Sequence, residues 1–213
     1  GRNGKILKDK LNKIKLINYD FSINMLKEAR KKQNHHTNLS LEVDELSFVC
    51  GDIEELTFPE NTFDIIWSTS SFQWCNNISD TFKEIKKILK PGGFFIFSTF
   101  GPNTLFELKS ITKEISKYQK TNDFVSIQCI KNILDTEGFS NPIINSEEFC
   151  ISYKDVTKLF LDLKKIGASS GFESKNHGLS GKLFLKLISD GYKKYSYDGI
   201  FPATYEVLYG YAW

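Results

Sequence analysis

Arginine is almost missing from this 213-residue chain, which has only Arg2 and Arg30 among its 28 basic residues. The 26 acidic residues leave a formal net charge of +2, which excludes a broad nucleic-acid-binding surface. No apolar run reaches the roughly 18 residues that a membrane-spanning helix needs, so we expect no membrane association.

Cysteine and histidine are also scarce, and their spacing argues against a metal site. The four cysteines, Cys50, Cys75, Cys129 and Cys150, form no C-x-x-C pair, and three histidines accompany them. We therefore expect no zinc and predict reduced thiols in a cytoplasmic protein. The hydrophobic share of 40% supplies a core, and the length suits one domain.

Strands and helices are expected to alternate along the first hundred residues. Strands are predicted at 15–20, 46–50, 63–68 and 94–100, and helices at 6–14, after Ser22 and at 79–90, with a polar loop at 31–38. On the helix after Ser22, residues Met25, Leu26 and Ala29 share one face. The apolar run at 63–68 is typical of a strand buried on both faces. This order predicts an α/β fold, a parallel sheet with helices on both faces, whose strand ends form one crevice.

The rest of the chain is expected to add a lid. Helices are predicted at 104–115, 127–137, 155–166 and 182–195, and strands at 143–153 and 203–213. The lysine-rich pair of helices between the last two strands reads as a lid inserted at about 154–200. In the last strand, Tyr205, Val207, Tyr209, Tyr211 and Trp213 alternate onto one side.

Two acidic residues follow predicted strands and suit a nucleoside. Gly1-x-x-Gly4 opens onto a helix and normally follows a strand, so we expect the chain to lack its first strand. Asp20 lies 19 residues after Gly1, where a carboxylate can bind a ribose, although capping the next helix is the alternative. Asp52 can accept the amine of an adenine and Ile53 can offer its N–H, with an ordinary turn as the alternative.

The segment after the third strand is a candidate for the crevice floor. Ser68 is small, and Phe72, Gln73 and Trp74 can turn inward over a ligand, unless Phe72 and Trp74 belong to the core. No nucleophile stands beside a base and no paired catalytic carboxylates occur. A nucleoside site without a general base suggests that the cofactor itself is activated.

These residues resemble the class I S-adenosylmethionine-dependent methyltransferases. The shared pattern is Gly1-x-x-Gly4, Asp20, Gly51-Asp52-Ile53, Phe63-Asp64 and Leu89-Lys-Pro-Gly-Gly93. Within them, the chain is similar to the malonyl-acyl-carrier-protein O-methyltransferases of biotin synthesis. The narrower pattern comprises residues 70–74, 97–105, 163–168, 178–181 and 202–210.

The resemblance implies a Rossmann-like methyltransferase sheet with 1–100 as its cofactor half and 101–213 as its substrate half, within one domain. S-adenosylmethionine is the expected cofactor, bound by Gly1, Gly4, Asp20, Phe21, Met25, Asp52, Ile53 and Ser68. Phe72, Gln73 and Trp74 are the expected substrate pocket, without any catalytic group. The expected partner is malonyl-acyl carrier protein or malonyl-CoA, docked by Lys164 and Lys165 on a monomer.

Three alternatives stay open from the sequence. The chain can methylate a quinone or another small acceptor instead. It can be a methyltransferase-like assembly factor of respiratory complex I that binds a partner protein. A nicotinamide dehydrogenase is the third, but it needs a hydride-transfer partner such as a tyrosine–lysine pair, which is not evident. Lacking arginine in its lid, the chain has to hold a substrate carboxylate with lysine, tyrosine, serine or backbone N–H groups.

Overall fold

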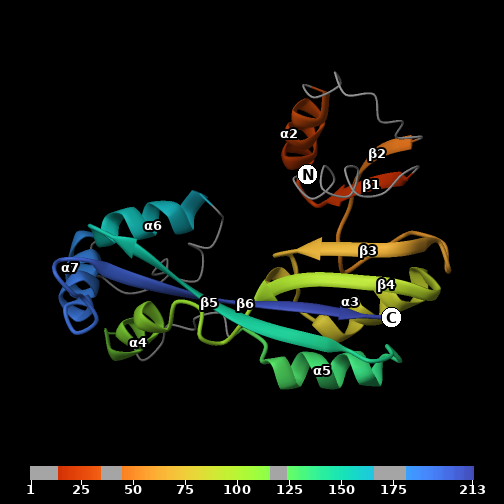
Figure 1. Ribbon diagram of the computed structural model, residues 1–213. Coiled ribbons are helices and arrows are strands. Elements are labelled where there is room, and N and C mark those ends of the chain that lie inside the picture. Colours follow the sequence, from red (N-terminus) through yellow and green to blue (C-terminus); the bar gives the residue numbers. More distant parts are fainter. Residues whose placement is uncertain (1–13, 35–44, 116–123, 166–180) are drawn as a thin grey trace. The chain divides into compact units, whose positions relative to one another are not determined.

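The computed structural model describes residues 14–34, 45–115, 124–165 and 181–213 (Figure 1). Gly1, Gly4 and nearly all of the helix predicted at 6–14 lie outside these residues. The chain divides into two compact units, Gly1–Thr62 with Cys75–Lys90, and Phe63–Trp74 with Pro91–Trp213. The division into a cofactor half and a substrate half of one domain stays a prediction.

The first unit contains a pair of parallel strands. Strand β1 (Lys15–Asp20) pairs with β2 (Glu45–Cys50) from Lys15 opposite Glu45 to Asp20 opposite Cys50. This confirms both predicted strands and their parallel direction. Helix α2 (Ile23–Asn34) runs further than predicted, because the loop expected from Lys31 is still helical there. No proline or glycine interrupts this stretch, and Lys31 forms an ion pair of 2.7 Å with Glu28 one turn earlier.

Helix α3 (Ile78–Ile88) completes the first unit, with bounds that differ slightly from the prediction. It begins earlier because Asn77 is its N-cap, accepting hydrogen bonds from Ser79 N at 3.0 Å and Asp80 N at 3.4 Å. It ends before Leu89, where strand β4 (Leu89–Phe100) starts. The predicted break at Pro91 thus comes two residues late, since a proline already disfavours helical backbone at the residue before it.

The second unit is built on a four-stranded sheet of order β3-β4-β6-β5. Its other strands are β3 (Phe63–Thr69), β5 (Ile143–Tyr153) and β6 (Phe201–Ala212), and its shorter helices are η1 (Phe72–Trp74), α4 (Phe106–Ile115) and α5 (Ile127–Thr136). The parallel sheet was predicted from the strands of the first hundred residues only, and the later strand β6 adds antiparallel pairs, since it runs antiparallel to both β4 and β5.

One expectation about strand burial is corrected by the structure, and the alternation predicted for the last strand is present. Strand β3 is not buried on both faces, since Ile65 is 41% and Trp67 36% exposed. Within the described ranges it is the edge strand of its sheet, and other elements do not fully cover its faces. In β6 the alternation is real, but the buried side is the one opposite the tyrosines, comprising Thr204, Glu206, Leu208, Gly210 and Ala212.

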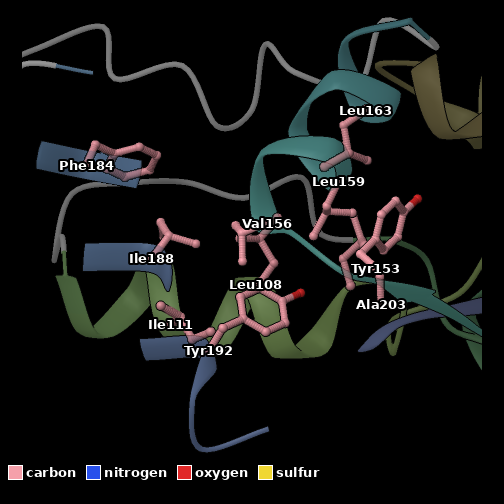
Figure 2. Packing of buried hydrophobic residues seen from close by; sticks show 11 residues of the cluster. Leu108, Ile111, Tyr153, Val156, Leu159, Leu163, Phe184, Ile188, Tyr192 and Ala203 are labelled. Atoms are coloured by element: carbon pink, nitrogen blue, oxygen red, sulfur yellow. The ribbon is translucent and has the colours of Figure 1, made fainter. Parts of the chain in front are cut away.

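The predicted lid helices lie between β5 and β6 in sequence, as expected. They are α6 (Val156–Lys165) and α7 (Gly181–Tyr192). Figure 2 shows how they share a core with α4: Leu108 and Ile111 meet Ile188 and Tyr192, and Leu159 adds its side chain from α6. Among the described residues no helix is long and apolar enough to cross a membrane.

Candidate cofactor and substrate sites

Asp20 and Asp52 lie at the carboxyl ends of the two parallel strands of the first unit's sheet. Asp20 is the last residue of β1 and stands opposite Cys50, the last residue of β2. Gly51 N donates a hydrogen bond of 3.2 Å to Asp20 O, which ties the two strand ends together directly before Asp52. Parallel strands therefore bring the two predicted nucleoside-binding acids to one edge.

The Asp20 side chain caps the N-terminal end of helix α2. Its Oδ1 accepts a hydrogen bond of 2.8 Å from Ser22 N, so the capping role is present, and ribose binding stays a prediction beside it. Two large apolar side chains stand in solvent next to it: Phe21 is 77% and Met25 60% exposed. Of the residues predicted to share one face of α2, Leu26 is buried, whereas Met25 is exposed.

Tyr19 orients the turn that carries Asp52, a role that the sequence analysis missed. Its hydroxyl donates a hydrogen bond of 2.8 Å to Asp52 O, and its ring packs edge-on against Phe58 at 5.4 Å. Burial, followed by the nearby Asp52 carboxylate, raises the pKa of Tyr19. A Cβ at Gly51 would lie 2.2 Å from the Tyr19 hydroxyl oxygen, so this approach requires glycine. Asp52 Oδ1 in turn accepts from Glu54 N at 2.9 Å.

Glu54 connects this turn to the start of helix α3. Its carboxylate accepts hydrogen bonds from Asn76 N (2.8 Å), Asn76 Nδ2 (2.8 Å) and Asn77 N (2.9 Å). The bond from Asn77 N is the largest cause of the lowered pKa of Glu54. Asn77 is also the N-cap of α3, so the segment containing Asp52 and the helix start are held by one carboxylate.

We expect Glu54→Gln to lower the unfolding temperature at neutral pH and to matter less in acid. A lowered folded-state pKa contributes stability above the ordinary glutamate range, about pH 4.3, and this contribution is lost as pH falls through the folded value. Thermal unfolding at about pH 7 and about pH 3 measures the difference between the two proteins. A difference that is equal at both pH values would contradict the role, and the exposed neighbour Glu55→Gln is the matched control.

Gln73 is fixed between the ends of β3 and β4 in the second unit. Its Nε2 donates to Ser70 O at 2.7 Å, and its Oε1 accepts from Thr99 Oγ1 at 3.4 Å. Ser70 has a positive φ of 51° and donates from its N to Ser98 O at 2.9 Å. Ser68 is 8% exposed, and its Oγ has no hydrogen-bond partner among the described residues.

The two aromatic residues of the predicted pocket have different surroundings. Phe72 is 2% exposed and packs edge-on against Phe95 at 5.7 Å and Phe97 at 5.9 Å, which favours the core alternative for it. Trp74 is 48% exposed and is not a core residue. Contact of either ring with a substrate stays a prediction, and Gln73 and Trp74 are the better placed candidates.

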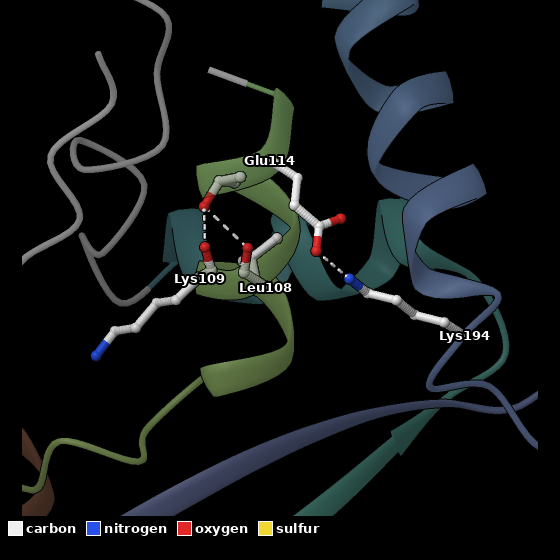
Figure 3. A network of polar contacts seen from close by, with 5 residues as sticks. Leu108, Lys109, Glu114 and Lys194 are labelled. Atoms are coloured by element: carbon white, nitrogen blue, oxygen red, sulfur yellow. Dashed lines mark hydrogen bonds and ion pairs between the residues drawn. The ribbon is translucent and has the colours of Figure 1, made fainter. Parts of the chain in front are cut away.

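The lid lysines differ in their partners. Lys165 lies 2.8 Å from Asp162, Lys193 lies 2.7 Å from Asp190, and Lys194 bonds Glu114 of α4, as Figure 3 shows. Burial, followed by Asp162, raises the pKa of Tyr153, so Asp162 also lies near the end of β5. Lys164 is exposed and has no ion pair within the described part of the chain. Docking of a partner by Lys164 and Lys165 stays a prediction, and of the two only Lys165 has an ion pair within the described ranges.

Several buried polar groups of the second unit were not foreseen. Glu107 is 1% and Glu206 8% exposed, and both lie in the helix α4 and strand β6 region. The Tyr192 hydroxyl is buried without a hydrogen-bond partner in the described ranges, and burial raises its pKa. The sequence signal for the two carboxylates is a glutamate within an otherwise apolar or aromatic run. No group of three metal-ligating side chains occurs among the residues that the structure describes.

Comparison with known proteins identifies relatives along the whole chain. The family described as "Methyltransferase domain" matches residues 1–97. A malonyl-[acyl-carrier protein] O-methyltransferase from Methylovorus sp. is 37% identical over 93% of this chain and 67% of that protein. One from Gallionella capsiferriformans is 35% identical over 100% of this chain and 73% of that protein. The chain therefore spans about two thirds to three quarters of the length of these relatives.

Solved structures agree on the fold. The YcgJ protein of Bacillus subtilis has a TM-score of 0.61 at 13% identity, covering 100% of this chain and 86% of that one. Phosphoethanolamine N-methyltransferase 2 of Haemonchus contortus, solved with S-adenosyl-L-methionine, has a TM-score of 0.55 at 18% identity, covering 99% and 52%. The Rossmann-like methyltransferase fold that the resemblance implied is thus confirmed. The sequence relatives go further and show that the chain belongs to the malonyl-[acyl-carrier protein] O-methyltransferase family.

Proposed function

We propose that this protein transfers the methyl group of S-adenosylmethionine to the free carboxylate of malonyl-acyl carrier protein, giving the methyl ester, in biotin synthesis. The observation that carries the proposal is the 37% and 35% identity to enzymes of that name over nearly the whole chain. The edge shared by Asp20 and Asp52 supports it, because it offers two carboxylates to a nucleoside.

S-adenosylmethionine supplies an electrophilic methyl group on its sulfonium. In the proposed site Asp20 accepts the ribose hydroxyl protons and Asp52 accepts the adenine amine, while Ile53 N donates to the ring. Phe21 and Met25 are exposed beside Asp20 and can cover apolar parts of the nucleoside. Gly1, Gly4 and Ser68 complete the proposed set, with Gly1 and Gly4 outside the described residues.

The reaction requires no general base. A malonyl carboxylate is ionised at neutral pH and is itself the nucleophile, which agrees with the lack of a nucleophile–base pair in the sequence. Attack on the methyl group forms the O–CH3 bond and breaks the S–CH3 bond. The protein contributes alignment and exclusion of water, and good positioning can be worth ~7–11 kcal/mol.

The second unit offers no arginine to the substrate carboxylate. Residues 63–74 and 91–213 contain none, since Arg2 and Arg30 precede them. Gln73, whose carboxamide is fixed by Thr99 and Ser70, is the proposed donor, with Trp74 beside it along the chain. Neutral donors of this kind bind a carboxylate with less bidentate precision than a guanidinium.

Methyl-ester formation tests the proposal directly. Radiolabelled S-adenosylmethionine is incubated with malonyl-acyl carrier protein, malonyl-CoA and a quinone acceptor, and the labelled products are separated. We expect the label in a base-labile malonyl methyl ester. Faster labelling of an acceptor that lacks a carboxylate would contradict the proposal and favour a methyltransferase of another small molecule.

We expect Lys164→Glu to raise KM for the carrier-bound substrate and to leave turnover of malonyl-CoA nearly unchanged. Reversing a charge at a docking surface weakens association with an acidic partner but does not alter the acyl site. Steady-state kinetics on both substrates measure this. Lys165→Glu is the contrasting variant, because it places a second acid beside Asp162 and should impair both substrates alike. A substrate-selective effect of Lys165→Glu would show instead that both lysines dock the carrier.

Action in the cytoplasm is part of the proposal. The four cysteines are free, and Cys50, Cys129 and Cys150 are exposed. Free exposed thiols are typical of a reducing compartment.

A further inference from the structure

Two sequence segments of the family resemblance, residues 97–105 and 202–210, bind each other in the second unit. Gly101 N donates to Glu206 O at 2.9 Å, and Leu105 N donates to Thr204 O at 2.6 Å. The Thr104 hydroxyl donates to Glu206 O at 2.9 Å and accepts from Glu206 N at 3.1 Å. The loop that leaves β4 is therefore attached to strand β6 along its whole length.

The side chain of Glu206 adds a second attachment. Its Oε2 accepts a hydrogen bond of 2.8 Å from Asn103 N, and its Oε1 accepts one of 2.9 Å from Ser146 Oγ on β5. One carboxylate thus joins the loop to two strands. The approach requires glycine at position 101, where a Cβ would lie 2.4 Å from Glu206 Oε2.

This attachment is costly for the folded chain. Glu206 is 8% exposed and, among the described residues, forms no ion pair. Burying a carboxylate without a cation is unfavourable, and hydrogen bonds compensate for it only in part. Leu105 also has a positive φ of 55°, a strained conformation for a residue with a side chain. The side chain of Glu206 therefore fixes the conformation of the loop more tightly than the two main-chain hydrogen bonds to β6 would do alone.

The loop follows strand β4, whose last residues contact the proposed acceptor-binding residue Gln73. It begins where β4 ends, and there Thr99 Oγ1 donates to Gln73 Oε1 at 3.4 Å. Ser98 O accepts from Ser70 N at 2.9 Å, so the ends of β3 and β4 are also joined. A shift of the loop would therefore be passed through Thr99 to the carboxamide of Gln73.

We infer that Glu206 is a positioning residue that fixes loop 101–104, and through it Thr99 and Gln73, for methyl transfer. The inference rests on the proposed function, in which the acceptor binds at Gln73. The inferred role is indirect and assigns Glu206 no contact with either reactant. It acts through Asn103 N and Gly101, and Ser146 holds its other oxygen in place.

Kinetics of four variants test the inference. Glu206→Ala should reduce kcat about 100-fold on both malonyl-acyl carrier protein and malonyl-CoA, the size of loss that a displacement of about 1 Å can cause. Affinity for S-adenosylmethionine should stay within about twofold, since neither Glu206 nor loop 101–104 belongs to the proposed cofactor-binding set. Glu206→Gln should recover most of kcat, because its Oε still accepts from Asn103 N and its amide can donate to Ser146 Oγ. Gly101→Ala displaces the same carboxylate from the loop side and should reproduce the loss of kcat.

Glu107→Ala is the matched buried control. Glu107 is 1% exposed and accepts from Thr204 N at 3.2 Å and from Thr204 Oγ1 at 2.6 Å, but it has no bond to loop 101–104. It should lower the unfolding temperature as much as Glu206→Ala while kcat stays within about threefold. Equal loss of kcat in both variants at equal loss of unfolding temperature would overturn the inference and leave a merely structural role.

Hydrogen exchange separates this inference from the proposed function. In Glu206→Ala the amides of Gly101, Asn103 and Thr104 should exchange at least about 100-fold faster, with those of α5 unchanged. If the unsubstituted protein binds S-adenosylmethionine but methylates no malonyl substrate, the proposed function fails, and exchange still decides on Glu206. Unchanged exchange at residues 101–104 would overturn the inference whatever the activity.

Discussion

Asp20→Ala is expected to weaken S-adenosylmethionine binding about 10- to 150-fold. The carboxylate at the end of β1 is the proposed partner of the ribose hydroxyls, and removing one partner of a charged hydrogen bond costs about 1.5–3 kcal/mol. Titration calorimetry with S-adenosylmethionine measures the affinity directly. Unchanged affinity would remove Asp20 from the cofactor site.

Asp20 also caps helix α2, so its two roles have to be separated. Asp20→Asn keeps an oxygen that can accept from Ser22 N, where Asp20 Oδ1 now accepts at 2.8 Å. It should therefore preserve the unfolding temperature but still lose much of the affinity. Ser22→Ala is the converse control, because it removes the hydroxyl that accepts from Met25 N at 3.4 Å and should leave affinity alone. Weak binding in Ser22→Ala would mean that the helix start, and not the carboxylate, governs the site.

Gly51→Ala is expected to weaken cofactor binding by at least about tenfold and to destabilise the fold by about 1–3 kcal/mol. The added Cβ would lie 2.2 Å from the Tyr19 hydroxyl oxygen and 2.6 Å from Tyr19 Cζ. The ring cannot keep its hydrogen bond to Asp52 O, and the turn that presents Asp52 and Ile53 loses its anchor. Calorimetry and thermal unfolding of the same preparations measure both effects.

A double-mutant cycle shows whether the clash is the cause. Tyr19→Ala makes room for the new methyl group, so the two changes together should cost less than the sum of the single changes. Tyr19→Phe is a milder probe, because it removes the hydroxyl but keeps the ring against Phe58. Strict additivity of Gly51→Ala and Tyr19→Ala would mean that Gly51 acts through something other than Tyr19.

Local sequence patterns predicted most elements of this fold, because they depend on neighbours along the chain. Strand β5 follows its predicted bounds, and the lid helices differ by a few residues at their ends. Asp20 and Asp52 were placed correctly at strand ends because a parallel pair aligns its carboxyl ends, and the family assignment is confirmed by the relatives.

What the sequence did not predict depends on contacts between distant segments. Glu206 reads as an ordinary glutamate among tyrosines, and only the pairing of β6 with the loop after β4 reveals its carboxylate as buried. Tyr19 and Glu54 are similar cases, since their partners lie 33 and at least 22 residues away. The burial of β3 was overestimated because an apolar run does not tell whether other elements cover both faces of the strand.

The lid is a long connection between two strands that pair with each other in antiparallel direction. Strands β5 and β6 pair from Ile143 with Tyr211 to Tyr153 with Phe201, and both lid helices lie between Tyr153 and Phe201 in the chain. The entropy of closing such a loop rises only slowly with its length, by about 0.6 kcal/mol per doubling. Related chains can therefore lengthen, shorten or exchange this connection with little change in the free energy of folding. They can thus recognise new acceptors on an unchanged sheet. The same topology slows folding, because the two strands meet only after the intervening chain has been brought together.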